Sequence, residues 1–548
     1  MWNRSLMYCI NDAKERGICL YGAGYWGDVA YKIFSMFHVM PLCYCDDDAL
    51  KVGKKYNGIS IMSLQEAAKQ FPNAVYIVCI DLTRKPGATN RDLQKNMLDN
   101  LRKHNIYDSN SEIRLPFYVF LLDIDGYVGI RSCKEQLCNY NTDNMFFWDK
   151  LTNLTVLSNM SNSGVWFFVQ LLDMHSQILS LPYCESLEEV YKNRLQYLKD
   201  DELIIEMTAQ MLGYFKSDYE DLDCVGQHRF QNFCVDENGE NIKGAYIEPL
   251  DFLVNLYLQF KDGDIKLHSY GHMLKIYFAA YNNCIHRKYE AGKNYWILYD
   301  VHKPDYDVAK EYDYLSSDEF DRIENLIVIR EPVQHCFSWV KRMMITEKNN
   351  GAAIRECIAG IIRSELGTNL QKKEGFDNLH VIKFEDIKYE GKKTLEVLCD
   401  FLQIPFEESM MKTTLNGIEV YFPANTQDGV KYITGFDTSA ASQKDFSDIL
   451  TSWDEVRLNI FYSVFKKALG YKTEYPAFYE LKEETLKDIL KEDFKFASII
   501  QDVVNKYLKK DQQYDVNKFI KELLMDYVKN FDERTVTYYD YIGTVTEV

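Results

Sequence analysis

Two short segments of this 548-residue sequence combine residue types that bind phosphate. The first is the turn Ser158–Trp166 (SNMSNSGVW), where small residues leave backbone N–H groups bare at the start of an apolar helical stretch. A helix N-terminus carries about half a positive charge, so such a turn can seat an anion. A plain strand-to-helix turn is the alternative, because the Gly-Lys-Ser/Thr of a Walker loop does not follow.

The second segment places an arginine at the end of a predicted strand. The apolar run Leu326–Ile329 leads into Arg330, and Pro332 then sits where a helix can begin. Ser338 follows eight residues after the arginine. The planar guanidinium matches a phosphate with two parallel hydrogen bonds, and the serine hydroxyl could donate to the same group. A helix start with a solvent-exposed ion pair is the alternative.

A glycine loop lies near the N-terminus. Gly22, Gly24 and Gly27 form the pattern G-x-G-x-x-G between an apolar run and a helical stretch, and Asp46 follows 19 residues after the last glycine. In dinucleotide-binding folds the glycines allow a tight turn and close approach of a pyrophosphate, and the acid takes a ribose hydroxyl. The loop predicts a Rossmann-like fold, whose glycines can also be purely structural.

Strands and helices that could position these segments alternate along most of the chain, which predicts an α/β fold with parallel sheets. In residues 1–145 the predicted elements are Ile18–Tyr21, Asp28–Phe37, Pro41–Cys45, Ser63–Phe71 and Ala74–Ile80. In residues 150–475 they include Leu154–Met160, Val165–Met174, Ile178–Leu181, Leu326–Ile329, His380–Phe384 and Lys392–Leu402. Residues 476–548 have apolar side chains at helical spacing, which predicts a C-terminal extension of packed amphipathic helices.

Composition narrows the class of protein. Lys and Arg number 63 against 82 Asp and Glu, so the net charge of −19 disfavours a nucleic-acid-binding surface. With 47% hydrophobic residues extensive disorder is excluded, and no stretch approaches the roughly 18 apolar residues of a membrane-spanning helix. Fourteen cysteines lack a regular spacing. We therefore expect a cytoplasmic protein with reduced thiols, no transmembrane segment and no nucleic-acid partner.

Roughly residues 16–105 resemble small nucleotide-binding-type domains that accompany bacterial surface-sugar enzymes. The resemblance lies in Gly22–Gly27, in Asp46-Asp47-Asp48, in Gly53-Lys54-Lys55 and in Asn57–Ile61. It implies a link to surface polysaccharide assembly and a possible nucleotide or NAD ligand. It does not imply hydride transfer, since a dehydrogenase acid/base pair is not evident.

About 320 residues of the middle region resemble the sulfotransferases that use 3′-phosphoadenylyl sulfate (PAPS). The similar segments occur in the family's order and are Ser161–Trp166, Leu171–Ile178, Arg330–Ser338, Val381–Ile387, Cys399–Phe406 and Leu469–Tyr471. The resemblance implies a P-loop-like sulfotransferase fold for residues 150–475. It also implies that the 5′-phosphosulfate is bound by Ser161, Asn162, Ser163, Gly164, Val165 and Trp166, and the 3′-phosphate by Arg330, Ser338 and Lys444.

One position departs from the family pattern. The family usually has Lys or Arg in the first loop, where this sequence has Asn162. That cation neutralises charge on the sulfuryl bridge, and loss of such a donor costs about 3 kcal/mol of transition-state stabilisation. Either another cation replaces it, with Lys303, Lys383 and Lys444 as candidates, or the protein is a weak or inactive homologue.

Transfer of a sulfuryl group also needs a base for the acceptor proton. By resemblance Glu185, which follows the first helix and strand, is the base, as in carbohydrate and tyrosylprotein sulfotransferases. His302, two residues before Pro304, is the competing base, and His302 or Lys303 would lie near the leaving oxygen. A surface carboxylate at Glu185 and a structural histidine at position 302 are the alternatives.

No metal is expected. His268 and His272 are spaced i, i+4, but a third ligand is not evident, so a structural pair is the better interpretation. The leading hypothesis is therefore a PAPS-dependent sulfotransferase acting on a carbohydrate or surface-glycan precursor. The alternatives are an inactive binding or scaffold protein of the same fold and an NAD-linked sugar enzyme. The sequence leaves the acceptor and the oligomeric state open.

Overall fold

The computed structural model describes most of the chain. The described residues are 6–79, 88–112, 122, 129–137, 140–159, 163–181, 187–211, 235–240, 242, 247–260, 264–301, 315, 319–335, 337, 379–426, 429–434, 436, 448–507, 510, 513–531 and 540–543. They divide into two compact units. The first contains Met1–Asp149, Glu189–Val235 and Asn241–Glu290, and the second contains Lys150–Glu188, Asp236–Glu240 and Ala291–Val548.

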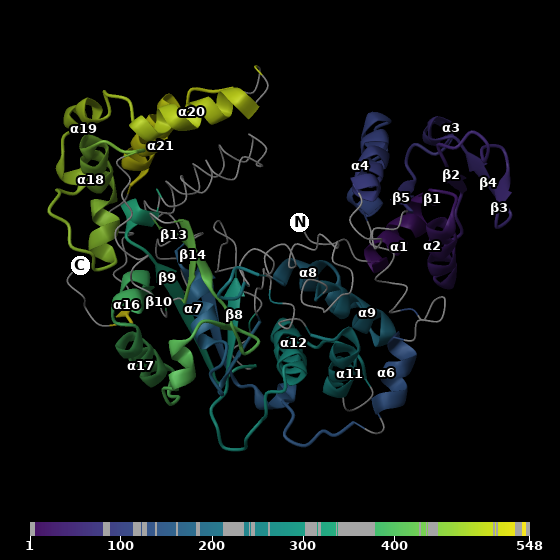
Figure 1. Ribbon diagram of the computed structural model, residues 1–548, viewed down its shortest axis with the longest axis horizontal. Coiled ribbons are helices and arrows are strands. Elements are labelled where there is room, and N and C mark those ends of the chain that lie inside the picture. The colour runs from purple at the N-terminus through teal and green to yellow at the C-terminus, as the bar shows by residue number, and fades with distance from the viewer. Residues whose placement is uncertain are drawn as a thin grey trace. The chain divides into compact units, whose positions relative to one another are not determined.

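The first unit contains a five-stranded sheet in the order β3-β4-β2-β1-β5 (Figure 1). Strands β1 (Ile18–Tyr21), β2 (Cys43–Cys45), β4 (Ile59–Met62) and β5 (Val75–Val78) are parallel, and β3 (Lys55–Tyr56) forms a hairpin with β4. Strand β1 is fully buried, as its apolar sequence requires. Strands β2, β4 and β3 lie on one side of β1, and β5 lies on the other side. The strand order therefore reverses at β1, and sheets of this kind bind ligands at such a point.

Helices cover this sheet and extend the unit. They are α1 (Leu6–Arg16), α2 (Tyr25–Met36), α3 (Leu64–Gln70), α4 (Ala88–Lys103) and the turn η1 (Ser109–Glu112). Further along the chain follow α6 (Gly129–Leu137), η3 (Trp148–Lys150), α8 (Glu188–Asn193), η4 (Leu195–Tyr197), α9 (Asp200–Gln210), α11 (Pro249–Gln259) and α12 (Tyr270–Cys284). The backbone N–H of Met7 in α1 donates to the buried Glu206 carboxylate in α9 at 3.1 Å, so the late helices pack with the N-terminal ones.

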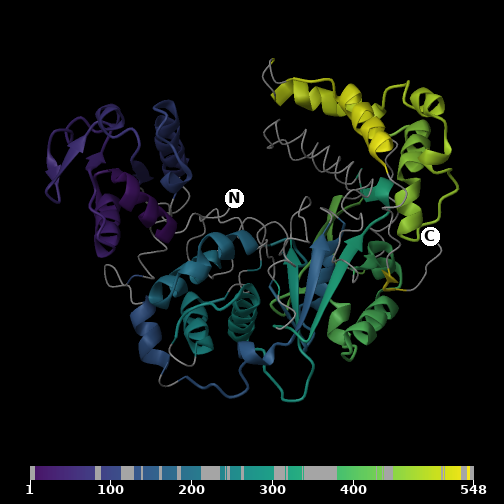
Figure 2. The same ribbon diagram turned by 180° about the vertical axis from the view of Figure 1, so that it is seen from behind.

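The second unit is built on a six-stranded sheet in the order β15-β10-β9-β6-β8-β7, with every neighbouring pair parallel. The strands are β6 (Asn153–Asn159), β7 (Ile178–Ser180), β8 (Trp296–Val301), β9 (Arg322–Ile329), β10 (Leu379–Lys383) and β15 (Asp540–Tyr541). Figure 2 shows the long strands side by side. Residues alternate between the two faces, since side chains of a strand point to opposite sides.

Helices pack on both faces of this sheet. Side chains of α7 (Val165–Leu172) and α17 (Gly391–Leu402) share one core with Leu326, Val328 and Ile382. Side chains of α18 (Ser452–Ala468) pack on the other face against Ile327, Ile329 and Val381. The intervening elements are α16 (Phe384–Tyr389), η7 (Glu408–Met411), β11 (Thr414–Leu415), β12 (Ile418–Glu419), β13 (Phe422–Thr426) and β14 (Gly429–Ile433).

The C-terminal helices share a separate apolar core with α18. They are η9 (Phe478–Glu480), α19 (Glu483–Ile489), α20 (Lys495–Tyr507) and α21 (Val516–Asn530). In α18 the buried Arg457 donates to Asp454 of the same helix and to the backbone oxygens of Glu492 and Asp493, which tie the helices together. The strand β15, which the sequence did not predict, then returns from this region to the edge of the sheet.

The prediction of an α/β fold with two parallel sheets and C-terminal helices is confirmed. The two units distribute the predicted ranges 1–145, 150–475 and 476–548 differently, because residues 189–290 belong almost entirely to the first unit and the C-terminal helices to the second. Within the described part of the chain, helices lack the length and apolar character that crossing a membrane requires.

Candidate functional site

The carboxyl edge of the six-stranded sheet gathers the predicted phosphate-binding segments. Strands β6 and β9 are parallel neighbours in the register Asn159 to Val328, so the segments that leave them start at the same edge. Of the predicted site residues here, Ser163, Gly164, Val165, Trp166 and Arg330 are described. Outside the described residues lie Ser161, Asn162, Glu185, His302, Lys303, Ser338 and Lys444.

The turn before α7 has the conformation of an anion seat. Gly164 is the residue preceding the helix and has a φ of +98°, which favours glycine. Because glycine offers no capping side chain, the first N–H groups of α7 are left for another acceptor. Ser163 is only 1% exposed, and its hydroxyl has no hydrogen-bond partner among the described residues. A buried hydroxyl without a partner is costly, so a ligand atom would complete this turn.

The Gly164 turn also lies directly against the Phe384 ring. A Cβ added to Gly164 would be 2.6 Å from Cε2 of Phe384 and closer still to Cδ2. The guanidinium carbon of Arg330 lies 5.2 Å from the centroid of the same ring. The structure therefore brings the turn and the arginine, which are far apart in the sequence, to one aromatic side chain.

Arg330 is half-buried immediately after β9. Burial lowers its pKa, although the negative charge of Glu385 opposes this effect. Within the described part of the chain its guanidinium has no hydrogen bond or ion pair, and its contact is with the face of Phe384. A guanidinium offers five N–H donors, so one in this state is suited to an anionic ligand with several oxygens.

A half-buried carboxylate holds the backbone that follows Arg330. The Glu385 carboxylate accepts the backbone N–H of Glu331 at 2.9 Å and the hydroxyl of Tyr471 at 3.0 Å. Burial raises the pKa of both Glu385 and Tyr471. Lys466 of α18 pairs with Glu331 at 2.8 Å. These contacts hold the backbone next to Arg330 in place. They also bring the segments around residues 385 and 471 together beside it.

Lys383, a candidate replacement for the loop cation, is engaged elsewhere. It is 5% exposed, and its Nζ donates to the backbone oxygen of Gly470 at 2.7 Å. The rings of Tyr471 and Tyr541 each lie 4.7 Å from this nitrogen. Lys383 shares the face of β10 with Val381, which packs toward α18, whereas α7 covers the opposite face. Lys383 therefore supports the C-terminal strand rather than the Gly164 turn.

Two other motif segments stabilise the opposite end of the sheet. The Asp173 carboxylate accepts the hydroxyl of Thr414 at 2.9 Å, and Nε2 of His175 lies 2.7 Å from the backbone oxygen of Pro405. The indole N–H of Trp296, at the start of β8, donates to the oxygen of Leu402 at 2.9 Å. The segments 171–178 and 399–406 therefore fix the amino ends of the strands and take no part in ligand binding at the carboxyl edge.

In the first unit, two of the three loop glycines are sterically required. Gly22 has a φ of +121°, and a Cβ there would be 2.6 Å from the oxygen of Cys79. A Cβ on Gly27 would overlap the carbonyl oxygen of Gly22, so helix and strand pack closely at this point. A Cβ on Gly24 would meet nothing within 4 Å. Gly24, the glycine that a phosphate would approach in a dinucleotide-binding loop, therefore has free space beside it.

Asp46 is bound to the protein itself. Its carboxylate accepts the N–H of Ala23 at 2.8 Å and of Asp48 at 3.0 Å, and it pairs with Lys51 at 2.9 Å. Burial alone would raise its pKa, but the hydrogen bonds from Asp48, Lys51 and Ala23 outweigh burial and lower it. Asp46 therefore fastens the glycine loop to the end of β2, which leaves the predicted ribose contact without support from the structure.

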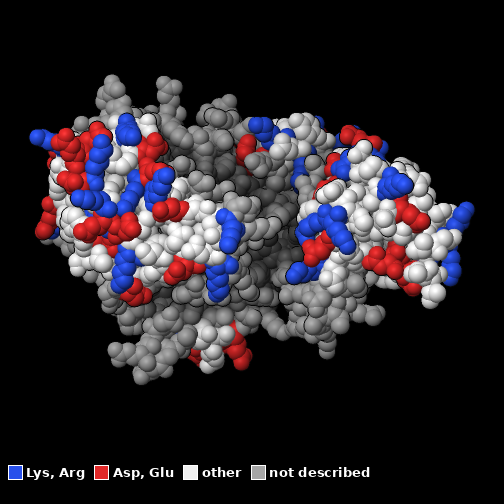
Figure 3. All heavy atoms as spheres, turned by 90° about the horizontal axis from the view of Figure 1, so that it is seen from above, with Lys and Arg blue, Asp and Glu red and all other residues white. Residues whose placement is uncertain are grey.

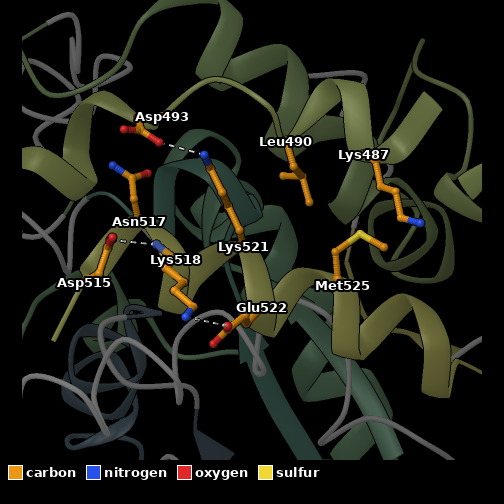
Figure 4. A pocket seen from close by; sticks show the side chains of 9 residues that line it. All are labelled: Lys487, Leu490, Asp493, Asp515, Asn517, Lys518, Lys521, Glu522 and Met525. Carbon is orange, nitrogen blue, oxygen red and sulfur yellow. Dashed lines mark hydrogen bonds and ion pairs between the residues drawn. The ribbon is translucent and has the colours of Figure 1, made fainter. Parts of the chain in front are cut away.

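A separate hollow of about 360 Å³ lies over the C-terminal helices (Figure 4). Its charged side chains are largely paired with one another, as Lys521 with Asp493 at 2.7 Å and Lys518 with Glu522 at 3.9 Å. Figure 3 shows cationic and anionic side chains interleaved over the described surface seen from above. Such pairing leaves little net field for a charged ligand, so the hollow is not the candidate site.

Sequence reasoning missed Phe384 as the ring that joins the two phosphate-binding segments. It also missed Asp300, a buried carboxylate near the carboxyl end of β8 that pairs in register with Leu157. An acid inside the otherwise apolar strand Trp296–Val301 was the available signal for Asp300. Phe384 carried no signal, because an aromatic residue after a strand is most often part of a core.

Two solved structures are similar to parts of the chain. A sulfotransferase domain from the olefin synthase of Synechococcus PCC 7002 has 16% identity, covers 48% of this chain and 78% of its own, and gives a TM-score of 0.25. A sulfotransferase domain from the curacin biosynthetic pathway has 14% identity, covers 63% of this chain and 99% of its own, and gives a TM-score of 0.26. TM-scores this low carry no argument about this chain. No family model and no curated protein matches the sequence.

Proposed function

We propose that this protein transfers a sulfuryl group from PAPS to a hydroxyl or amine of a carbohydrate or surface-glycan precursor. The observation that carries the proposal is the meeting, at the Phe384 ring, of the Gly164 turn and the Arg330 guanidinium, which has no ion pair among the described residues. A ligand with two phosphate-type groups on one nucleoside would satisfy both, together with the hydroxyl of Ser163. The order of the sequence motifs is the second support.

Different described residues would bind the two phosphate-bearing ends of such a donor. The N–H groups at the start of α7 and the Ser163 hydroxyl would hold the 5′-phosphosulfate, because a helix N-terminus favours anions. Arg330 would hold the 3′-phosphate through two parallel hydrogen bonds. Glu385 and Tyr471 are positioning residues, since they hold the backbone next to Arg330 rather than a ligand.

The donor supplies an activated sulfur: the acceptor oxygen or nitrogen bonds to it, the bond to the bridging oxygen breaks, and the electron pair leaves with the phosphate of adenosine 3′,5′-bisphosphate. The acceptor proton must pass to a base of the chain. Glu185 is proposed for that role on the sequence resemblance alone, with His302 or Lys303 near the leaving oxygen. The glycan acceptor rests on the N-terminal resemblance, which is an analogy between folds.

Titration calorimetry with adenosine 3′,5′-bisphosphate tests the site. We expect the wild-type chain to bind it and Arg330→Ala to weaken binding about tenfold or more, because a charge-assisted fork is lost. Lys393→Gln, on the exposed side of α17, is the control and should bind normally. Sulfate transfer from labelled PAPS to a glycan extract then tests the reaction. Failure of the wild-type chain to bind the nucleotide would refute the proposal.

A further inference from the structure

Lys388 places a second cation beside Phe384, the ring against which the Gly164 turn packs. It lies in α16, is half-buried, and its Nζ is 4.4 Å from the centroid of the Phe167 ring. The same nitrogen is 5.8 Å from the centroid of Phe384, the ring that Gly164 and Arg330 contact. The Gly164 turn, Arg330 and Lys388 therefore all lie beside the pair of rings formed by Phe167 and Phe384.

The position of Phe167 shows which part of α7 the ammonium faces. Phe167 is the third residue of the helix, so its ring leaves the first turn, where the N–H groups lack intrahelical acceptors. The rings of Phe167 and Phe384 lie 6.1 Å apart and nearly perpendicular, at 76°. An ammonium beside both rings adds a positive charge near the start of α7, where the 5′-phosphosulfate is proposed to bind.

Among the residues that the structure describes, the turn itself contributes no cation. The sequence has Asn162 where related enzymes carry a cation, and Lys383 is held on the other face of β10. An amide can donate a hydrogen bond but cannot neutralise the charge that builds on a leaving phosphate oxygen. Lys388 comes from a different element, α16, and its ammonium lies beside Phe384, the ring against which the turn packs.

We infer that Lys388 binds the 5′-phosphosulfate end of the nucleotide and replaces the cation that the turn lacks. This inference rests on the proposed function and assigns a further residue to its site. The ammonium would share the 5′-phosphate oxygens with the first N–H groups of α7. In the reaction it would stabilise the negative charge that the bridging oxygen takes up as its bond to sulfur breaks.

Nucleotides that carry one phosphate each separate the two ends of the site. Competition against labelled adenosine 3′,5′-bisphosphate gives the affinities of adenosine 5′-monophosphate and adenosine 3′-monophosphate for each variant. We expect Lys388→Met to weaken binding of the bisphosphate and the 5′-monophosphate about tenfold and to leave the 3′-monophosphate unchanged. Arg330→Ala should show the reverse selectivity, and Lys388→Arg should restore the 5′ affinity because it keeps the charge.

Lys393→Met is the matched control, since it removes a lysine from neighbouring α17 that is 65% exposed and pairs with Glu390. Unchanged affinity of Lys388→Met for the 5′-monophosphate would overturn the inference while the nucleotide site stands. Equal weakening of all three nucleotides with a lowered unfolding temperature would assign Lys388 a packing role and overturn it as well. If the wild-type chain binds none of the nucleotides, the proposed function itself fails.

Discussion

Replacing Gly164 by alanine tests how closely the turn before α7 packs on the Phe384 ring. An alanine must keep a φ of +98°, which costs about 1–2 kcal/mol in the left-handed region. Its methyl group would also overlap the Phe384 ring, and overpacking of this kind costs about 1–3 kcal/mol. Together the two effects predict a loss of about 2–5 kcal/mol in the free energy of unfolding of the second unit.

Gly292 provides a control in the same unit. Its φ of +84° is similar, but a Cβ there would meet nothing within 4 Å. Gly292→Ala therefore carries the backbone cost alone, about 1–2 kcal/mol. The difference between the two variants in urea-induced unfolding, followed by tryptophan fluorescence, measures the contribution of the Phe384 contact.

A second comparison identifies the ring as the cause. In a Phe384→Leu background the smaller side chain can move aside, so the cost of Gly164→Ala should fall to the value of Gly292→Ala. The displaced ring also contacts Arg330, so Gly164→Ala alone should weaken binding of adenosine 3′,5′-bisphosphate. An unfolding cost of Gly164→Ala that equals that of Gly292→Ala in the wild-type background would refute the packing described here.

Two further predictions concern charged groups that hold each unit together. Asp46→Asn should destabilise the first unit by about 1–3 kcal/mol at neutral pH, because charge-assisted hydrogen bonds are weakened. The folded-state pKa of Asp46 lies below the ordinary value of an aspartate, so its contribution is complete above that ordinary value and is lost as the pH falls through the lower folded pKa. Urea unfolding at several pH values should therefore show the wild-type advantage shrinking in acid, and a constant advantage would contradict this assignment. Arg457→Met should cost about 3–5 kcal/mol, since Asp454 would be left buried without its partner. Thermal unfolding measures this loss, adding Asp454→Asn should recover part of it, and a change below about 1 kcal/mol would contradict it.

The strands of both sheets could be predicted from the sequence because they are short, buried apolar runs. The predicted strand Ile18–Tyr21 coincides with β1, and Leu154–Met160 differs from β6 by one residue at each end. The strand β15 could not be predicted, because two residues, Asp540 and Tyr541, carry no periodicity. Their pairing with β10 joins segments about 160 residues apart, which only the tertiary fold determines.

The candidate site was predicted in part. Parallel strands release their chains at one edge, so the meeting of the Gly164 turn with Arg330 followed from recognising β6 and β9 as strands. The position of Lys388 in α16 did not follow, because it lies beside Phe167 and Phe384 only through the tertiary packing of these two rings. For Asp46 the motif suggested a contact with a ribose hydroxyl, and nothing in the sequence indicated the ion pair with Lys51, five residues away, that the structure shows.

The division of the chain into two units has a consequence for dissecting the protein. The N-terminal part of the chain belongs to the first unit, and β6 and β7 then belong to the second unit. The helices of residues 189–290 belong to the first unit again, and β8 is the next strand of the second sheet. Cutting after residue 149 would separate α1 from α9 and remove the acceptor of the Met7 N–H. Fragments defined by consecutive residue numbers would therefore each lack a piece of their own core, and functional dissection is better made with point substitutions in the intact chain.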